Sequence, residues 1–243
     1  MEKKTFETKL KSLKQVAKGT FEVTVEKPKG FAFTAGQYSA LFLVNPKSQD
    51  PRGNDREFSI ASSPHEKDIR FVFRETPSIF KQQLLQLKPG DAVRIQEPSG
   101  LFVLPESADR EVVFLVGGVG ATAVRSILNH AHANELPHKI TMLYSNRTPE
   151  ETVFIDELRE LSKKYKIVLT MTGIEGSSSK WDEEVSRIDK NFILKHIPDY
   201  ADKLFYIIGP LSFTSAMVKM TRELSIPFSQ VKLESYGLYG RGI

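Results

Sequence analysis

The N-terminal part of the chain alternates apolar and polar side chains in short segments that glycine and proline separate. The clearest segment, TFEVTVEK at 20–27, has the period of two that is typical of a strand with one buried face. Short strands at this spacing, with turn residues between them, indicate an antiparallel barrel or sandwich. The other predicted strands are Tyr38–Val44, Arg56–Ala61, Asp68–Arg74 and Asp91–Gln96.

One helix interrupts these strands. Ser78 precedes it in the position of a capping residue, and Pro89–Gly90 ends it. Its apolar face is formed by Phe80, Leu84 and Leu87. The helix therefore packs one side against the predicted barrel.

The pattern changes after about Pro105, where continuous apolar runs replace the alternation. Such runs are typical of parallel strands that are buried on both faces. The segments between them have helix length and apolar faces, for example Val124 with Ile127 and Leu128. The runs are EVVFLV, KITMLY, KIVLTM and KLFYII.

We therefore expect a two-domain protein, an antiparallel β-barrel followed by an α/β domain with a parallel sheet. The polar string ESADRE joins the two patterns, so we place the domains at residues 1–107 and 108–243. A chain of 243 residues is long enough for two such cores.

Composition adds mainly exclusions. Hydrophobic residues make up 40% and charged residues 26%, which is usual for a folded globular protein. The N-terminal sequence has no apolar core of signal-peptide length and no run suits a membrane span, so we expect a cytoplasmic protein. The net charge of +4 is scattered and gives no reason to expect a nucleic-acid partner.

The sequence has no cysteine, which excludes disulfides, thiolate nucleophiles and cysteine-held iron–sulfur clusters within it. Its five histidines show no metal-ligand spacing, and we predict no metal site. If this chain moves electrons, an organic cofactor has to carry them.

A glycine loop follows the EVVFLV run directly. In Gly117–Ala123, the residues Gly118, Gly120 and Ala123 fit the G-x-G-x-x-G/A pattern between a strand and a helix. Glycines allow the backbone to approach a pyrophosphate, and the N-terminus of the helix offers free N–H donors. The alternative is a tight strand-to-helix turn without a ligand, which the pattern alone does not separate from a nucleotide site.

The next apolar run ends in Ser145, Asn146 and Arg147, where a classical NADH site has an acidic residue. A serine and an arginine suit the 2′-phosphate of NADPH better, because guanidinium forms charge-assisted bonds with phosphate. This favours NADPH over NADH. The alternative is a solvated arginine on a loop.

Five motifs in this order resemble those of the ferredoxin–NADP reductase family. Arg56–Ser59 is similar to its R-x-[YF]-S motif and Ala35–Tyr38 to its A-G-Q-[YF] turn. Ser78 and, further on, Pro89–Asp91 resemble its second flavin segment and the strand that follows it. In the second half, Gly117–Ala123 and Ile208–Pro210 resemble its glycine loop and its C-G-P motif.

The resemblance covers the whole chain and implies a short bacterial-type member without an iron–sulfur domain. It implies a six-stranded barrel that binds FAD, with FMN the less favoured cofactor, and an α/β domain that binds NADPH or NADH. Arg56 then pairs with the flavin pyrophosphate, and Phe58 packs on the ribityl or ring region. Ser59 hydrogen-bonds near flavin N5 or O4, where hydride arrives.

Other residues take roles from the same resemblance. Ser78 binds the pyrophosphate, with a plain helix cap as the alternative, and Thr122 lies near the nicotinamide. Ser59 and Thr122 are therefore the candidate catalytic residues. The predicted cofactor-binding residues are Tyr38, Arg56, Phe58, Ser59, Ser78, Gly117, Gly118, Gly120, Thr122, Ser145, Arg147, Gly209, Pro210 and Tyr239.

The sequence departs from the family pattern in three places. Ile208 replaces the cysteine before Gly-Pro, and Ala123 replaces the proline that follows the glycine-loop threonine. The C-terminal Glu234–Tyr239 resembles an E-x-F-x-G-Y ending without its second glycine, which leaves open whether Tyr239 covers the flavin.

These observations predict a flavin-dependent enzyme that transfers hydride between NAD(P)H and bound FAD and passes electrons to a separate acceptor. A flavodoxin, a ferredoxin, a haem protein or a small oxidant all fit as the acceptor. The alternative is a nucleotide-binding electron-transfer or regulatory subunit with little turnover of its own, which the missing cysteine at Ile208 favours.

Overall fold

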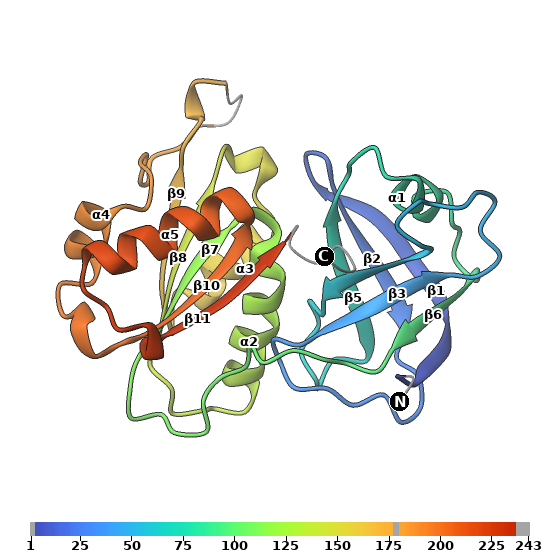
Figure 1. Ribbon diagram of the computed structural model, residues 1–243, viewed down its shortest axis with the longest axis horizontal. Coiled ribbons are helices and arrows are strands. Elements are labelled where there is room, and N and C mark those ends of the chain that lie inside the picture. The colour runs from blue at the N-terminus through green and yellow to red at the C-terminus, as the bar shows by residue number, and fades with distance from the viewer. Residues whose placement is uncertain (1–2, 177–179, 237–243) are drawn as a thin grey trace. The chain divides into compact units, whose positions relative to one another are not determined.

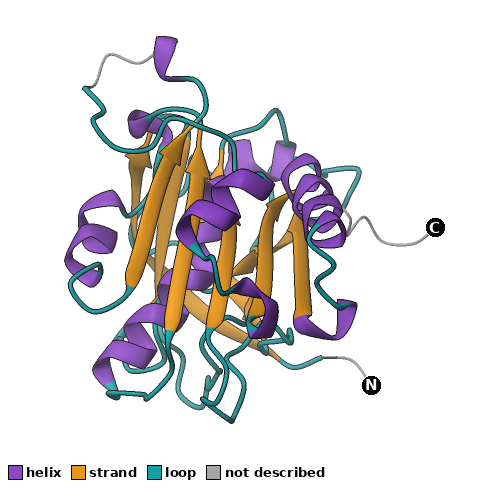
Figure 2. Ribbon diagram, turned by 90° about the vertical axis from the view of Figure 1, so that its left-hand side faces the viewer, coloured by secondary structure: helices purple, strands orange, loops and turns teal. Residues whose placement is uncertain are grey.

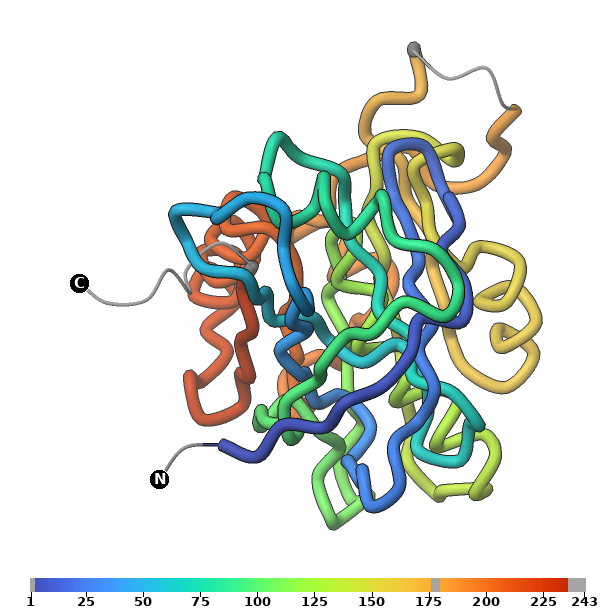
Figure 3. The backbone as a smooth tube through the Cα atoms, turned by 90° about the vertical axis from the view of Figure 1, so that its right-hand side faces the viewer, coloured from blue at the N-terminus to red at the C-terminus, as the bar shows by residue number. Residues whose placement is uncertain are grey.

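The computed structural model describes residues 3–176 and 180–236, which form two compact units (Figure 1). The first unit contains the chain up to Val103 together with Thr122–His130, and the second contains Leu104–Ala121 and continues from Ala131. Figure 3 follows the course of the backbone through each of them. The division between residues 107 and 108 stays a prediction.

The first unit is built on one antiparallel sheet in the order β4-β3-β6-β1-β2-β5. An isolated antiparallel bridge between Ile60 and Phe71 links its two edges, so the sheet curls like a barrel without a continuous closing ladder. This confirms the predicted antiparallel domain. Its strands are β1 (Thr5–Ala17), β2 (Thr20–Glu26), β3 (Tyr38–Leu43), β4 (Asp55–Ser59), β5 (Asp68–Arg74) and β6 (Ala92–Gln96).

Strand β1 is the element of this sheet that the pattern analysis did not predict. It pairs with both β2 and β6, but within it only Thr8 and Leu10 are buried. Lysine and glutamate fill most of its exposed positions, so its alternation carries little apolar signal.

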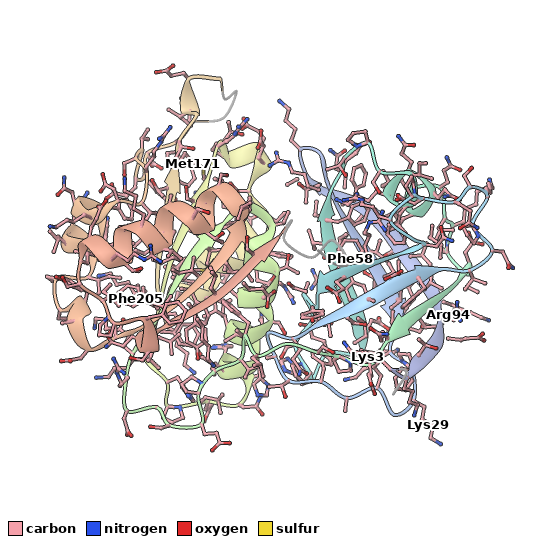
Figure 4. The ribbon with its side chains drawn as sticks, in the orientation of Figure 1. Lys3, Lys29, Phe58, Arg94, Met171 and Phe205 are labelled. Carbon is pink, nitrogen blue, oxygen red and sulfur yellow. The ribbon has the colours of Figure 1, made fainter. Side chains whose placement is uncertain are left out.

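Helix α1 (Ile79–Leu84) covers part of the barrel core. Ser78 caps it as predicted, and Phe80 and Leu84 are fully buried. Phe80 belongs to the same apolar cluster as Phe58, whose side chain is labelled in Figure 4. The core therefore fixes the start of α1 close to the strand that carries the R-x-F-S motif.

The second unit has a parallel sheet in the order β11-β10-β7-β8-β9, shown with its helices in Figure 2. The strands are β7 (Val112–Gly117), β8 (Ile140–Asn146), β9 (Lys166–Met171), β10 (Leu204–Pro210) and β11 (Val231–Tyr236). The helices of this unit are α3 (Ile155–Leu161), α4 (Lys190–His196) and α5 (Leu211–Glu223), whereas most of α2 (Ala121–Ala133), which follows β7 in the chain, belongs to the first unit. The predicted parallel α/β architecture is confirmed.

Alternate residues of the central strands enter a core with α4 and α5. Val113 and Leu115 of β7 and Phe205 and Ile207 of β10 pack in one cluster with methionines of α5. The residues between them in β7 and β10 are buried as well, so both faces of these strands are covered, which explains their continuous apolar runs.

No helix within residues 3–176 and 180–236 has the length and apolar character needed to cross a membrane. The cytoplasmic location stays a prediction.

Candidate functional site

Two of the predicted flavin residues lie side by side on neighbouring strands. Tyr38 of β3 is the register partner of Ser59 of β4, and residues directly opposite each other share one face of a sheet. Ser59 is buried and Tyr38 is half-buried. The turn before Tyr38 requires glycine, because Gly36 has φ of +100° and a Cβ there would lie 2.0 Å from the carbonyl oxygen of Phe102.

Arg56 turns its guanidinium toward the start of α1, 5.2 Å from the centroid of the Phe80 ring. Its Nη1 donates to the carbonyl oxygens of Gly53 at 2.9 Å and Asp55 at 2.5 Å. Its Nη2 lies 2.7 Å from Oδ1 of Asp50, an ion pair whose N–H direction does not meet hydrogen-bond geometry. The Nε of Arg56 is buried without a hydrogen-bond partner.

Asp50 was not among the predicted site residues, yet its carboxylate accepts hydrogen bonds from several groups near Arg56. Its Oδ2 accepts from Oγ of Ser78 at 3.1 Å and from the amide of Phe80 at 2.9 Å, and its Oδ1 accepts from the amide of Arg52 at 2.9 Å. The Asp50 side chain is only 4% exposed. In the sequence it is one aspartate of a polar turn followed by proline, a context that carries no functional signal.

Hydrogen bonds and the Arg56 guanidinium stabilise the charged form of this carboxylate. The Phe80 amide, more than any other group, holds the pKa of Asp50 well below its usual range; burial opposes this, and Arg52, Arg56 and Ser78 reinforce it. Burial and then the charges of Arg52 and Arg56 lower the pKa of Lys81 to about 8. We refer to Asp50, Arg52, Arg56, Ser78 and Lys81, with the Phe80 amide, as the Asp50 cluster.

Phe58 serves the core of the first unit. Its ring lies 5.7 to 6.3 Å from the rings of Phe71, Phe73 and Phe80, and the residue is 9% exposed. Aromatic packing thus accounts for a phenylalanine at this position. Its contact with a flavin stays a prediction.

The glycine loop follows β7 as predicted and forms a short turn, η1 (Gly118–Gly120), before α2. A Cβ on Gly120 would lie 2.7 Å from the carbonyl oxygen of Ile208, so packing of the turn on β10 alone requires this glycine. Gly118 differs: its φ is +54° and no atom lies within 4 Å of the position that a Cβ would take. The open side of the loop is therefore at Gly118.

The ends of β7 and β10 meet at two further glycines. A Cβ on Gly117 would lie 2.7 Å from the ring of Phe213 in α5, and one on Gly209 would lie 3.1 Å from Gly117. Pro210 ends β10 and is exposed. Ile208, which replaces the family cysteine, is fully buried within the sheet.

The remaining predicted residues differ in how exposed they are to solvent. Thr122 is the second residue of α2 and is 2% exposed. Ser145 is the register partner of Gly117 and half-buried, whereas Arg147 is exposed and forms no ion pair within the described residues. Tyr239 lies outside the described residues. In the described part of the chain, no group of three or more histidine, aspartate or glutamate residues is arranged to hold a metal ion.

Sequence comparison with known proteins finds a nucleotide-binding domain and several oxidoreductases. The family model for the oxidoreductase NAD-binding domain matches residues 114–222. The flavohemoprotein of Candida albicans is 29% identical over 191 residues, which cover 76% of this chain and 46% of that protein. One component of the Na⁺-translocating NADH-quinone reductase of Chlamydia trachomatis is 28% identical over 224 residues, covering 80% and 52%. The chain thus spans about half the length of these relatives.

Solved structures share the fold over nearly the whole chain. A ferredoxin NADP⁺ reductase from Neisseria gonorrhoeae with bound FAD and NADP has a TM-score of 0.79 at 19% identity, covering 96% of this chain and 99% of that one. The FAD/NAD-binding domain of nitric oxide dioxygenase from Vibrio cholerae gives 0.78 at 20% identity, covering 95% and 98%. The chain thus matches the oxidoreductase NAD-binding domain over residues 114–222 and shares the two-part fold of these solved structures.

Proposed function

We propose that this chain is an NAD(P)H-dependent flavoprotein oxidoreductase that binds FAD in its first unit and a nicotinamide dinucleotide at the glycine loop of its second. The observation that carries the proposal is the donor set of the Asp50 cluster. A guanidinium, a hydroxyl and an amide converge on one oxyanion there, within the unit that also pairs Tyr38 with Ser59.

These donors fit a flavin pyrophosphate by their chemistry. Arg56 and Ser78 are two residues that the family resemblance assigns to this group, and both contact the same carboxylate. Carboxylates and phosphates are held by the same charge-assisted hydrogen bonds, so a set that satisfies one suits the other. Ser59 and Tyr38 would then face the flavin ring from the neighbouring strands. FMN, which has one phosphate, is the alternative cofactor.

The second unit fits a dinucleotide at Gly118. Its left-handed backbone and the open space beside its Cα leave room for a ligand next to the N-terminal turn of α2. Ser145 ends the neighbouring strand and Arg147 follows it with an exposed guanidinium. We assign both to the ribose end of the dinucleotide and infer a preference for NADPH.

When bound, the flavin supplies the step between a two-electron donor and the next carrier, and the chain supplies orientation. The relatives are named as a flavohemoprotein, a subunit of an NADH-quinone reductase and a ferredoxin reductase component, and we infer from these names that this chain also passes electrons to another carrier. A flavodoxin, a ferredoxin, a haem protein or a small oxidant each fits. An electron-transfer or regulatory subunit with little turnover of its own is the second candidate, favoured by Ile208 at the cysteine position.

The test is to purify the chain and record its absorption spectrum and its NAD(P)H-dependent reduction of a dye. We expect yellow protein that releases FAD on denaturation and reduces the dye. Colourless protein that neither FAD nor FMN reconstitutes would overturn the proposal, whereas bound flavin without turnover would favour the second candidate.

A further inference from the structure

The Asp50 carboxylate occupies the donors that an incoming phosphate would need. Oγ of Ser78 and the Phe80 amide both point at its Oδ2, and the Arg56 guanidinium lies 2.7 Å from its Oδ1. We infer that Asp50 is an internal competitor of the flavin pyrophosphate, which holds the site in the flavin-free protein and leaves it when FAD binds. This inference rests on the function proposed above.

Shared occupation is unfavourable for two reasons. A single N–H or O–H cannot be directed fully at a carboxylate and a phosphate oxygen at once. In addition, two negative groups in a buried site repel each other more strongly than they would in water. Flavin binding therefore requires Asp50 to withdraw or to lose its charge.

The Asp50 cluster contains three cationic side chains and one carboxylate. Arg56 forms the ion pair with Asp50, and burial and then the charges of Arg52 and Arg56 lower the pKa of Lys81. The buried Nε of Arg56 is still without an acceptor. A doubly charged pyrophosphate would balance this charge better than Asp50 does.

The loop that carries Asp50 has few other contacts with α1 that would keep the Asp50 side chain in the site. Residues 47–49 and 51–52 around it are exposed, and Asp50 is the one buried position among them. Apart from Asp50, the loop is held to α1 by a pair of hydrogen bonds between the Ser48 backbone and the Gln83 side chain, at 3.1 and 2.8 Å. Gly53, with φ of +88°, provides the turn back into β4.

The direct experiment compares ligand affinities of flavin-free protein, using FAD, inorganic pyrophosphate and riboflavin as probes. Asp50→Asn keeps the side-chain shape and removes the charge. Asp68→Asn is the matched control, because Asp68 pairs with Lys11 outside the cluster. We expect Asp50→Asn to tighten FAD and pyrophosphate about tenfold, the effect of a change of about 1.4 kcal/mol. Riboflavin, which has no phosphate, should bind equally, and Asp68→Asn should match the parent.

A second measurement needs no variant. In the parent, the Arg52 amide is bonded to Asp50, whereas the Phe80 amide would find a new acceptor in the pyrophosphate. Addition of FAD should therefore speed hydrogen exchange at Arg52 and leave Phe80 protected. This measurement decides the matter if Asp50→Asn fails to fold.

The outcomes separate this inference from the proposed function. FAD that binds the parent while a folded Asp50→Asn shows equal or weaker affinity, or an Arg52 amide that stays protected, would make Asp50 a structural anchor and overturn the inference. Absence of flavin binding in parent and variant would overturn the proposed function. If neither protein binds flavin, tighter pyrophosphate binding by Asp50→Asn would still support the inference that Asp50 competes for the anion site. Equal pyrophosphate binding by parent and variant would overturn that inference as well.

Discussion

The Asp50 cluster and the glycine loop are both proposed cofactor sites, but side chains form the first and backbone forms the second. The first is made of charged and polar side chains that gather around one buried carboxylate. The second is made of backbone, with glycines at Gly117, Gly120 and Gly209 that the packing of β7, β10 and α5 requires by itself.

This difference changes how each motif indicates function. Apolar packing does not account for a guanidinium, a hydroxyl and an amide that converge on one buried aspartate, so the first site points to an anion. Most of the glycine signal is explained without a ligand, and only Gly118 has open space beside it. The glycine pattern as a whole is therefore weak evidence for a nucleotide site, and the stronger evidence is the open space at Gly118.

The largest expected effect comes from Gly120→Val. A glycine needed only for the approach of a dinucleotide would, when substituted, raise the KM for NAD(P)H, but the added side chain would also collide with the Ile208 carbonyl. We expect a loss of about 3 kcal/mol or more in the free energy of unfolding, because backbone on both sides has to shift. Thermal and denaturant unfolding measure it.

Gly118→Ala is the matched control in the same loop. It adds a Cβ into open space and costs only its left-handed backbone, about 1 kcal/mol. If Gly120→Val instead kept the parent stability and raised only the KM for NAD(P)H, the packing explanation of Gly120 would be wrong.

Arg56→Ala tests the charged site. It removes the partner of a buried carboxylate and should cost about 2 kcal/mol, below the range for fully buried pairs because three other donors to Asp50 remain. Flavin content should fall as well. Adding Asp50→Asn to Arg56→Ala should restore part of the stability in a double-mutant cycle, and simple additivity would show that the two side chains are not coupled.

Arg147→Ala tests the proposed contact with the 2′-phosphate of NADPH at the nucleotide site. Its exposed guanidinium should contribute about tenfold to the ratio of kcat/KM for NADPH over NADH, or about 1.4 kcal/mol. The ratio isolates the phosphate contact from general damage. An unchanged ratio would remove Arg147 from the site, and a parent that prefers NADH would defeat the NADPH assignment.

The smallest expected effect is pH-dependent and concerns Glu66 of the first unit. Burial alone would raise the pKa of Glu66, but hydrogen bonds from Arg125 and the Ser63 amide and the charges of Arg125 and Arg70 lower it below the ordinary 4.5. Since the folded state depresses this pKa, Glu66 stabilises the protein above about pH 4.5, and the contribution is lost as pH falls through the folded pKa.

Glu66→Gln should therefore cost about 1 kcal/mol at neutral pH and less as the pH falls below 4.5. Urea unfolding of both proteins across this range measures the difference. A difference that is constant with pH would show that the Glu66 charge is not involved.

The sequence predicted the elements whose patterns are local. The alternating segments became β2 to β6 and the continuous apolar runs became β7 to β10, because burial on one face or on both leaves its period in the chain. It did not predict β1, whose exposed lysines and Glu7 hide its pairing, or the elements α4, α5 and β11.

For the site, the sequence by itself determined which residue types stand at which motif: Arg56 and Ser59 on one strand, Ser78 at a helix start and glycines between a strand and a helix. Only the tertiary structure decided what those residues contact. Asp50 reaches Arg56 and Ser78 because the β3–β4 loop folds back onto α1, and Gly120 meets Ile208 because β10 lies beside β7. Contacts between residues far apart in the chain depend on how strands and loops pack, and no local pattern records that.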